Sequence, residues 1–169
     1  MLIPLTQNAC VIVDSDDYIY LSKHKWTLER TPYTAYAHRK IRRTKTIKMH
    51  RVIMNASHGV EVDHINHDGL DNRRSNLRLC SSSQNNQNQK LHRSYAGKTL
   101  SSKYKGVSWQ RQIKRWMSYI TNAGRRIYLG TFLQEVDAAL AYDKAARQLF
   151  GEFAYLNFPS NGSQPANQG

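Results

Sequence analysis

Residues 62–79 read VDHINHDGLDNRRSNLRL, and residues 80–90 continue as CSSSQNNQNQK. Apolar and polar side chains alternate over residues 60–63 and again over residues 76–79, which is the pattern of half-buried strands. Between them, residues 66–72 are rich in Asn, Asp and Gly, the residues that favour turns. The stretch therefore predicts a β-hairpin.

A short helix is expected to follow this hairpin. Ser81 is followed three residues later by Gln84, which is the spacing of a capping box at a helix N-terminus. The order strand, strand, helix can bring together four polar side chains that are well separated in sequence: Asp63, His64, Asn76 and Asn85.

These four side chains have the chemistry that phosphodiester hydrolysis needs, which is an activated water and a sink for charge on the leaving oxygen. Asp63 and Asn85 offer hard oxygen ligands, which suit Mg²⁺ or Mn²⁺. His64 is a candidate general base, and the side-chain carbonyl of Asn76 can fix the tautomer of His64. Taken singly, Asp63 could instead cap a turn and His64 could be a structural histidine.

Four motifs in this region, HRVIM, VDHIN, LDNRRSNLR and NNQN, resemble the HNH nuclease family in its homing-endonuclease branch. The resemblance implies a ββα-metal fold in which Asp63 and Asn85 bind the metal, His64 is the general base and Asn76 is the middle asparagine of the motif. It also implies cleavage of DNA to 5′-phosphate and 3′-hydroxyl ends. The closing residue is Asn rather than His, a variant familiar in phage members of the family.

The charge of the chain indicates a polyanionic partner. It has 169 residues, with 25 Lys and Arg against 12 Asp and Glu, and a net charge of +13. Residues 1–93 carry 15 basic and 8 acidic side chains and residues 94–169 carry 10 and 4, so the excess is not one cationic tail. Double-stranded DNA is the partner we expect.

A run of basic residues lies just before the hairpin. Residues 39–51 contain seven basic side chains and no acidic one. The alternative to a DNA-contacting hairpin is a solvated hairpin with cationic tips. The candidates for contact with DNA in this run are Arg39, Arg42, Arg43, Lys45 and Arg51.

The chain is expected to form two small α+β domains. Residues 94–102 are small and polar without periodicity, which is typical of a linker, so the expected domains are 1–93 and 103–160. Residues 161–169 are expected to be a disordered tail. In the first domain, β-prone runs at 9–13, 33–38 and 46–49 predict extra hairpins beside the ββα motif.

In the second domain, β-prone runs lie near residues 106–110, 115–121 and 126–129, and a helical pattern runs from 134 to 150. A small sheet packed on one helix is therefore expected. Spacing of three to four residues predicts the apolar face of this helix to be Val136, Ala139, Leu140, Ala146, Leu149 and Phe150.

Five motifs occur in order across residues 104–159: YKGVSWQ, RWMSYI, RIYLGTF, AALAYDKAARQLFG and AYLNFP. They resemble the plant APETALA-two/ethylene-response-factor DNA-binding domain. The resemblance implies a three-stranded antiparallel sheet lying in the DNA major groove, with one helix packed behind it. Ser108 and Tyr128 occupy positions where the plant domains have base-reading Arg and Trp, so the plant sequence preference is not carried over.

Strand alternation predicts which side chains of this sheet reach DNA. Trp116 and Ile120 are expected to face the helix, which leaves Tyr119 and Thr121 toward DNA. The expected DNA contacts of the second domain are Trp109, Arg111, Lys114, Arg115, Tyr119, Thr121, Arg125, Arg126 and Tyr128.

Several classes of protein are disfavoured. No stretch approaches the roughly 18 apolar residues of a transmembrane helix, and no signal-peptide pattern is present, so we expect a soluble protein without a membrane partner. Cys10 and Cys80 have no C-x-x-C spacing, which excludes a cysteine zinc site. A monomer in the cytoplasm of a bacterial or phage-infected cell is the expected setting.

The sequence predicts a metal-dependent, site-recognising DNA endonuclease that uses Mg²⁺, with Mn²⁺ as the second choice. Two alternatives remain open at this point. One is a catalytically silent DNA-binding regulator, and the other is a structure-selective or RNA-directed nuclease.

Overall fold

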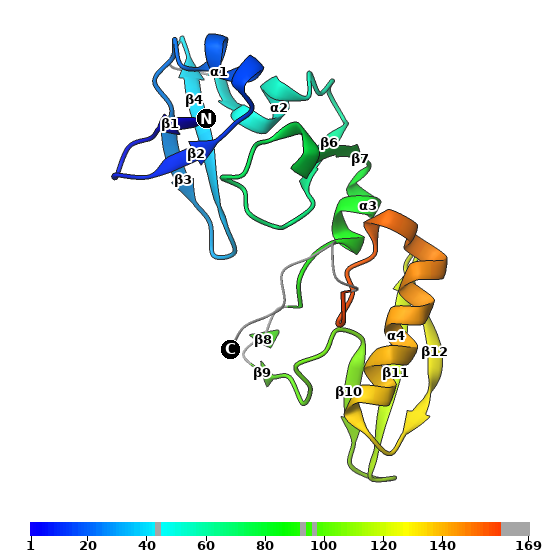
Figure 1. Ribbon diagram of the computed structural model, residues 1–169. Helices are drawn as coiled ribbons and strands as arrows, with labels where there is room; N and C mark the ends of the chain where they lie inside the picture. The colour runs from blue at the N-terminus through cyan, green and yellow to red at the C-terminus, as the bar shows by residue number, and fades with distance from the viewer. Residues whose placement is uncertain (43–44, 92–93, 96–97, 160–169) are drawn as a thin grey trace. The chain divides into compact units, whose positions relative to one another are not determined.

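A computed structural model of the chain describes residues 1–42, 45–91, 94–95 and 98–159. The described chain forms two compact units, Met1–Ser82 and Ser83–Gly169, which we describe separately (Figure 1). The division falls before the stretch expected to be a linker, and within that stretch the chain forms two short paired strands, β8 (Ser94–Tyr95) and β9 (Lys98–Thr99). The expected tail at 161–169 lies outside the described residues.

The described part of the first unit consists of three small antiparallel sheets, two short α-helices and one 3-10 turn. A hairpin of β1 (Leu2–Pro4) and β2 (Cys10–Ile12) precedes helix α1 (Ser15–Leu21). A three-stranded sheet then follows, and it is formed by β3 (Thr27–Arg30), β4 (Ala35–Ile41) and β5 (Lys45–Lys48). After helix α2 (Met49–Ile53), the chain forms strand β6 (Glu61–His64), a 3-10 turn η1 (Arg74–Asn76) and strand β7 (Leu77–Cys80). The β-prone runs of the first 60 residues thus correspond to β2, β4 and β5, while β1, α1, β3 and α2 were not predicted.

The core of the first unit is built where these elements meet. Trp26, at the entry to β3, is buried and donates its indole N–H to the carbonyl of Leu21 at 2.9 Å, which ties the end of α1 to the sheet. Burial of each large side chain here stabilises the fold by about 1.5–3 kcal/mol. The fully or nearly fully buried apolar side chains of this core include Val11, Val13, Leu21, Trp26, Leu28, Met49 and Ile53.

The β6–β7 hairpin predicted from the sequence is present, and its connecting loop packs on the N-terminal hairpin. The register pairs Asp63 with Arg78 and His64 with Leu77. Ile12 donates its backbone N–H to the carbonyl of Leu70 and accepts the N–H of Asn72, both at 2.8 Å. The loop from Leu70 to Asn72 therefore lies beside β2 like a short parallel strand, which holds it in place.

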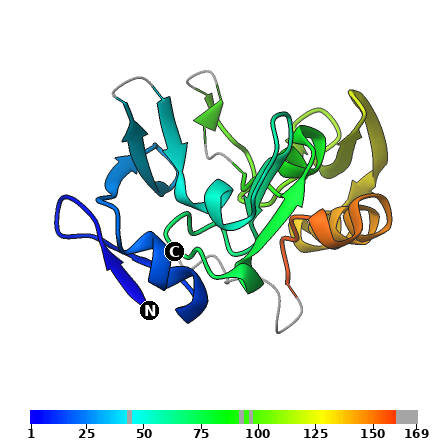
Figure 2. The same ribbon diagram turned by 90° about the horizontal axis from the view of Figure 1, so that it is seen from above.

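The largest part of the second unit is a three-stranded antiparallel sheet with one helix packed on it (Figure 1, Figure 2). The strands are β10 (Val107–Gln110), β11 (Arg115–Asn122) and β12 (Arg125–Phe132), in that order across the sheet. Helix α4 (Glu135–Phe150) contacts all three strands and continues into the 3-10 turn η2 (Gly151–Phe153). Helix α3 (Ser82–Gln87) begins at the boundary between the units, one residue after the predicted start. The molecule is mixed α+β, as expected.

The buried face of α4 differs in part from the expected one. Val136, Leu140 and Leu149 are 42–49% exposed, although spacing of three to four residues placed them with the core. The buried row runs instead through Ala138, Tyr142, Ala146 and Phe150, with Ala139 beside it. Ala138, Ala139 and Ala146 allow the helix to approach the sheet closely, and the rings of Tyr142 and Phe150 complete the core on the same side of the helix.

A buried carboxylate fastens the C-terminal segment to α4. Asp143 is fully buried and accepts the backbone N–H groups of Asn157 and Phe158, each at 2.8 Å. Burial raises the pKa of Asp143, and these hydrogen bonds oppose that rise. Nearby, Gly106 has φ +77°, and a Cβ there would lie 2.0 Å from the ring of Tyr142, so only glycine fits.

Lys105 joins α3 to the rest of the second unit. Its ammonium donates to the backbone carbonyls of Gln87 and Gln89, at 2.9 and 2.7 Å, just beyond the last turn of α3. A cation at the C-terminal end of a helix interacts favourably with the helix dipole. Burial lowers the pKa of Lys105 to about 8.

In the part of the chain that the structure describes, no helix has the length and apolar character needed to cross a membrane.

Candidate nuclease site and cationic surfaces

Strand β6 places Asp63 and His64 next to each other, and both side chains are buried. Asp63 lies opposite Arg78 of β7, so their side chains share one face of the hairpin. Both Nε and Nη2 of Arg78 donate to Oδ2 of Asp63, at 2.8 and 2.6 Å. The carboxylate that was predicted to bind a metal is thus engaged by a guanidinium.

His64 makes its side-chain hydrogen bond with Asn72. The distance between His64 Nε2 and Asn72 Oδ1 is 3.1 Å, and both side chains are buried. Burial is the largest effect on the pKa of His64 and lowers it, while the bond to Asn72 and the nearby Asp63 oppose that change. The imidazole is therefore neutral near pH 7, as a proton acceptor must be.

Two other rings pack around His64. The ring of His50, from α2, meets it edge to face with centroids 5.0 Å apart, and the ring of Tyr36, from β4, lies 5.8 Å away. Burial and the neighbouring cationic groups lower the pKa of His50 to about 3. Gly69 allows Tyr36 to take this position, because a Cβ on Gly69 would lie 2.7 Å from the tyrosine ring.

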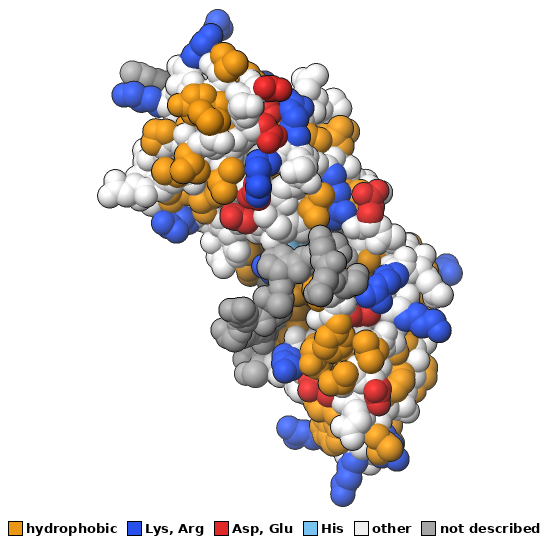
Figure 3. All heavy atoms as spheres, viewed as in Figure 1, with side chains coloured by type: hydrophobic (Ala, Val, Ile, Leu, Met, Phe, Trp, Pro, Cys, Tyr) orange, Lys and Arg blue, Asp and Glu red, His pale blue; other side chains and the backbone are white. Residues whose placement is uncertain are grey.

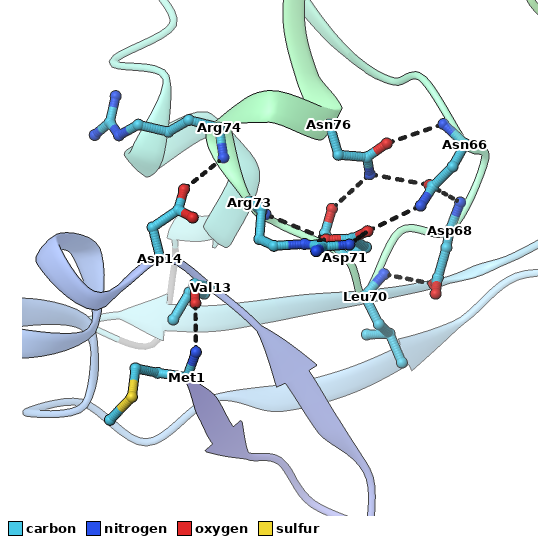
Figure 4. A network of polar contacts seen from close by, with 10 residues as sticks. All are labelled: Met1, Val13, Asp14, Asn66, Asp68, Leu70, Asp71, Arg73, Arg74 and Asn76. Carbon is cyan, nitrogen blue, oxygen red and sulfur yellow. Dashed lines mark hydrogen bonds and ion pairs between the residues drawn. The ribbon is translucent and has the colours of Figure 1, made fainter. Parts of the chain in front are cut away.

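Asn76 has a different hydrogen-bond partner from the one predicted. Its Oδ1 accepts the backbone N–H of Asn66 at 3.0 Å, and its Nδ2 donates to Oδ1 of Asn66 and to the carbonyl of Asp71 at 2.9 and 2.7 Å (Figure 4). Asn76 therefore braces the loop between the strands, and Asn72 is the residue that contacts His64. The prediction that Asn76 fixes the tautomer of His64 was wrong, because the amide of Asn76 is used within the loop.

The same loop is held by a carboxylate. Asp71 accepts Nε and Nη2 of Arg73 at 2.8 and 2.7 Å, and it also accepts the amide of Asn66 at 2.9 Å (Figure 4). These contacts, above all the hydrogen bonds from Arg73, lower the pKa of Asp71. Hydrogen bonds thus hold the loop on both sides of Asn72.

Asn85 lies on α3, in the second unit, and its side chain is half-buried. Its amide oxygen and the carboxylate of Asp63 are hard donors, and Mg²⁺ is commonly held by few protein ligands together with substrate phosphates and waters. Taken singly, each of these oxygen donors is of the chemical kind that suits the divalent cation implied by the motif. Within the described residues, no three His, Cys, Asp or Glu side chains gather as a metal site.

The basic residues of the first unit divide into different roles. The guanidinium of Arg39 lies 5.4 Å from the ring of Trp26, while Arg42 and Lys45 are exposed at the tip between β4 and β5. Arg51 donates to the carbonyls of Ala56, Ser57 and Val60, at 2.6–3.3 Å. The prediction that Arg51 contacts DNA conflicts with this arrangement, because its donors hold the loop after α2. Arg43 lies outside the described residues.

One face of the sheet in the second unit is not covered by α4. Cross-strand partners share a face, and the pairs Tyr119–Tyr128 and Thr121–Arg126 lie on this open face. The guanidinium of Arg126 lies 3.4 Å from the ring centroid of Tyr119. Arg115 is on the same face, because it precedes Tyr119 by an even number of residues and pairs with Gln110. Strand alternation predicted this surface correctly.

Four other expected DNA contacts lie elsewhere. Trp109 pairs with Trp116, and the two rings pack edge to face with centroids 5.0 Å apart on the side of the sheet that faces α4. Arg125 pairs with Asn122 and lies on that side too, at the exposed end of the sheet. Arg111 and Lys114 are exposed in the turn between β10 and β11. Trp109 and Arg125 are therefore not part of the open face.

In the view of Figure 3, Lys and Arg side chains are visible on each unit.

Asn72 and Arg78 were not singled out from the sequence. The position of Arg78 follows from the hairpin register, since any residue directly opposite Asp63 must share its face. No local pattern indicates Asn72, because its place depends on the contact between its loop and Ile12, sixty residues away in the chain.

Comparisons with known proteins match two parts of the chain. Residues 48–87 match the family model described as HNH endonuclease, and residues 102–152 match the AP2 domain. The first of these matches contains Asp63, His64, Asn76 and Asn85, and the second contains the three-stranded sheet and α4.

Several plant proteins are similar to a part of the chain. Dehydration-responsive element-binding protein 2D of Arabidopsis thaliana is 46% identical over an alignment of 74 residues that covers 38% of this chain and 35% of that protein. Dehydration-responsive element-binding protein 2A of Oryza sativa subsp. indica is 46% identical over 68 residues, 39% of this chain and 24% of its own. APETALA2-like protein 2 of the same subspecies is 43% identical over 61 residues, 36% of this chain and 14% of its own.

The matched region spans about a third or less of each of these plant proteins, so the likeness concerns one domain. The HNH match covers a separate segment, which includes the β6–β7 hairpin and α3. The chain therefore combines an HNH endonuclease-like domain with an AP2 domain.

Proposed function

We propose that this chain is a metal-dependent, site-recognising DNA endonuclease. The observation that carries the proposal is a buried imidazole, His64, whose pKa is lowered by burial and which follows directly after Asp63 in the hairpin of the HNH match. A neutral, oriented histidine beside a carboxylate is what hydrolysis of a phosphodiester by an activated water requires.

In the proposed reaction His64 removes a proton from a water molecule. The water oxygen forms a bond to phosphorus, the bond from phosphorus to the 3′ oxygen breaks, and the leaving oxygen takes a proton from solvent. The products are a 5′-phosphate and a 3′-hydroxyl. Burial of His64 among Tyr36, His50 and Asn72 keeps the ring in one orientation, which lowers the cost of reaching the reactive geometry.

Asp63 would be a ligand of a divalent cation, and the motif implies Asn85 as a second ligand. When bound, Mg²⁺ or Mn²⁺ supplies positive charge to the leaving oxygen and to the phosphate. Arg78 donates two hydrogen bonds to Asp63, and it would have to share or release this carboxylate for Asp63 to bind a cation. The guanidinium can then turn to a phosphate oxygen, for which its geometry is equally suited.

Recognition is proposed to come from the AP2 domain together with the cationic hairpin of the first unit. The plant proteins that resemble the second unit are named as element-binding proteins, and the open sheet face here carries Arg115, Arg126, Tyr119 and Tyr128. Arginine can read guanine edges in the major groove, and aromatic rings add contact area. Since Ser108 and Tyr128 differ from the plant base readers, we expect a different target sequence.

A second candidate is a DNA-binding regulator without nuclease activity. The ion pair between Arg78 and Asp63 favours it, because a carboxylate that stays paired with a guanidinium is a poor metal ligand. The likeness to plant element-binding proteins favours it as well. Both candidates bind duplex DNA, so only cleavage separates them.

The test is incubation of supercoiled plasmid with the full chain in Mg²⁺, in Mn²⁺ and in chelator, followed by mapping of the ends. We expect nicked or linear DNA with the metals and none with chelator. His64→Ala is expected to slow cleavage by at least about 10²-fold, as loss of a general base does, and to leave DNA affinity within about two-fold. His58→Ala, at an exposed histidine of the same unit, is the matched control and should cut normally. Binding without cleavage under every condition would favour the regulator.

A further inference from the structure

Asn72 is the most completely buried polar side chain near His64. It is 0% exposed, and every group of its side chain has a protein partner: Oδ1 faces His64 Nε2 at 3.1 Å and Nδ2 donates to the carbonyl of Gly69 at 3.3 Å. Its backbone N–H donates to Ile12 of β2 at 2.8 Å. A polar side chain held in this way from both ends has one available orientation.

That orientation decides which nitrogen of His64 carries the proton. If the amide of Asn72 were turned over, its oxygen would face the oxygen of Gly69, and two acceptors would meet without a proton between them. The amide oxygen must therefore face His64, and Nε2 of His64 must be the donor in this contact. In a neutral imidazole the other nitrogen, Nδ1, then has the free electron pair.

We propose that Asn72 is a positioning residue that fixes His64 in the Nε2–H tautomer, so that Nδ1 is the atom that accepts the proton of the attacking water. This inference rests on the proposed function and deepens it. Asn76, the middle asparagine of the motif, does not have this role, because its amide is bonded to Asn66 and Asp71.

The primary test is nitrogen NMR of the imidazole side chains in the full chain, without DNA or metal. His64→Gln assigns the His64 resonances. The wild-type protein is expected to show His64 as Nε2–H. Asn72→Leu, which has a similar volume and no acceptor, should give a mixture of tautomers. Asn72→Asp loses the donor to Gly69 but keeps an acceptor facing Nε2, and it should retain Nε2–H.

Cleavage provides the second readout. Loss of a group that orients a reactive histidine commonly lowers activity about 10- to 100-fold, and we expect Asn72→Leu to lower kcat by this factor with KM within about two-fold. Asn72→Asp should recover part of the loss. Asp71→Asn is the matched control, since it weakens the same loop through Arg73 and Asn66 but leaves the partner of His64 in place. It should lower stability without changing the tautomer.

Two results would overturn the proposal. One is a His64 that remains Nε2–H in Asn72→Leu, and the other is an Nδ1–H tautomer in the wild-type protein or in Asn72→Asp. A thermal melt establishes that each variant is folded. If Asn72→Leu is unfolded, the tautomer of His64 in Asn72→Asp is the test. If the wild-type chain fails to cut DNA, the proposed nuclease function is refuted, while the tautomer measurement still decides the role of Asn72.

Discussion

At the scale of single residues, His50 shows how burial of a titratable ring links stability to pH. Its side chain is 6% exposed, packs against His64 and Tyr36, and has an Nδ1 atom that is buried without a hydrogen-bond partner among the described residues. A charged imidazole cannot be solvated there, which is why its pKa falls to about 3.

This predicts a loss of stability in acid. The pKa of His50 lies below its ordinary value of 6.5, so the unfolded chain binds more protons than the folded chain between pH 6.5 and about 3. The contribution of His50 is fully present above pH 6.5 and falls by about 1.4 kcal/mol per pH unit as the pH drops through that window. Urea unfolding at pH 7, 6, 5 and 4.5 measures it.

The matched variants are His50→Phe and His58→Phe. We expect His50→Phe to keep an aromatic ring in the core and to flatten the dependence on pH, and His58→Phe, at an exposed position, to leave it unchanged. Equal slopes for the wild-type protein and His50→Phe would show that His50 does not limit stability in acid.

At the scale of secondary-structure elements, one ion pair connects α1 to the turn before β7. Asp17 of α1 is 2% exposed and accepts Nε and Nη2 of Arg74 at 2.8 and 2.7 Å. Arg74 begins η1, the turn that ends in Asn76, and its backbone N–H also donates to Asp14 at 2.8 Å (Figure 4). The N-terminal helix thus helps to place the loop of the candidate site.

Removal of this contact is expected to weaken the first unit. Asp17→Asn cannot accept the two guanidinium hydrogen bonds in the same way, because it has a single acceptor oxygen. A hydrogen bond to a charged group contributes about 1.5–3 kcal/mol to the free energy of unfolding. Because the Arg74 side chain is 55% exposed and can be hydrated, we expect a loss of about 2 kcal/mol in the free energy of unfolding. Asp16→Asn, at an exposed position in the same turn, is the control, and a similar loss there would refute the assignment.

The elements were predicted best where one local signal decides. Alternation and a capping box were enough for β6, β7 and α3, and alternation also found the open face with Tyr119 and Arg126. These local signals failed where packing between elements determines which face of an element is buried. Trp109 faces α4 because the turn after β10 pairs it with Trp116, and Val136 is exposed because the row of alanines is the one that packs on the sheet.

The candidate site was predicted in part for the same reason. Asp63 and His64 follow from their place at the end of a strand, and the hairpin brings them close to Asn76. The assignment of Asn72 and Asn76 could not be made from sequence, because both are loop asparagines with similar neighbours. Only the contact of the loop with Ile12 determines which of them reaches His64.

At the scale of the whole molecule, the net charge of +13 predicts a steep dependence of DNA affinity on salt. Each phosphate that a cation neutralises contributes a slope of about −0.9 to the logarithm of affinity against the logarithm of salt concentration. Arg126→Gln and Arg115→Gln on the open sheet face should each reduce the slope by about 1 if they contact phosphate. Lys144→Gln, exposed on α4, should leave it unchanged.

The measurement is the fluorescence anisotropy of a labelled duplex titrated with the full chain, at salt concentrations from about 50 to about 300 mM. A slope that is shallow in the wild-type protein, or that changes as much in Lys144→Gln as in Arg126→Gln, would contradict a DNA-binding role for the open face.

Lys105 has a consequence for how such modules can be exchanged between proteins. It belongs to the AP2 match, yet its ammonium holds the carbonyls of Gln87 and Gln89, where the HNH match ends. A chimaera that joins residues 1–93 to a foreign reading domain would keep all four motif residues but lose this cation. Recombination of cutting and reading modules therefore has to preserve a positive charge at this position, or the helix that carries Asn85 loses its C-terminal support.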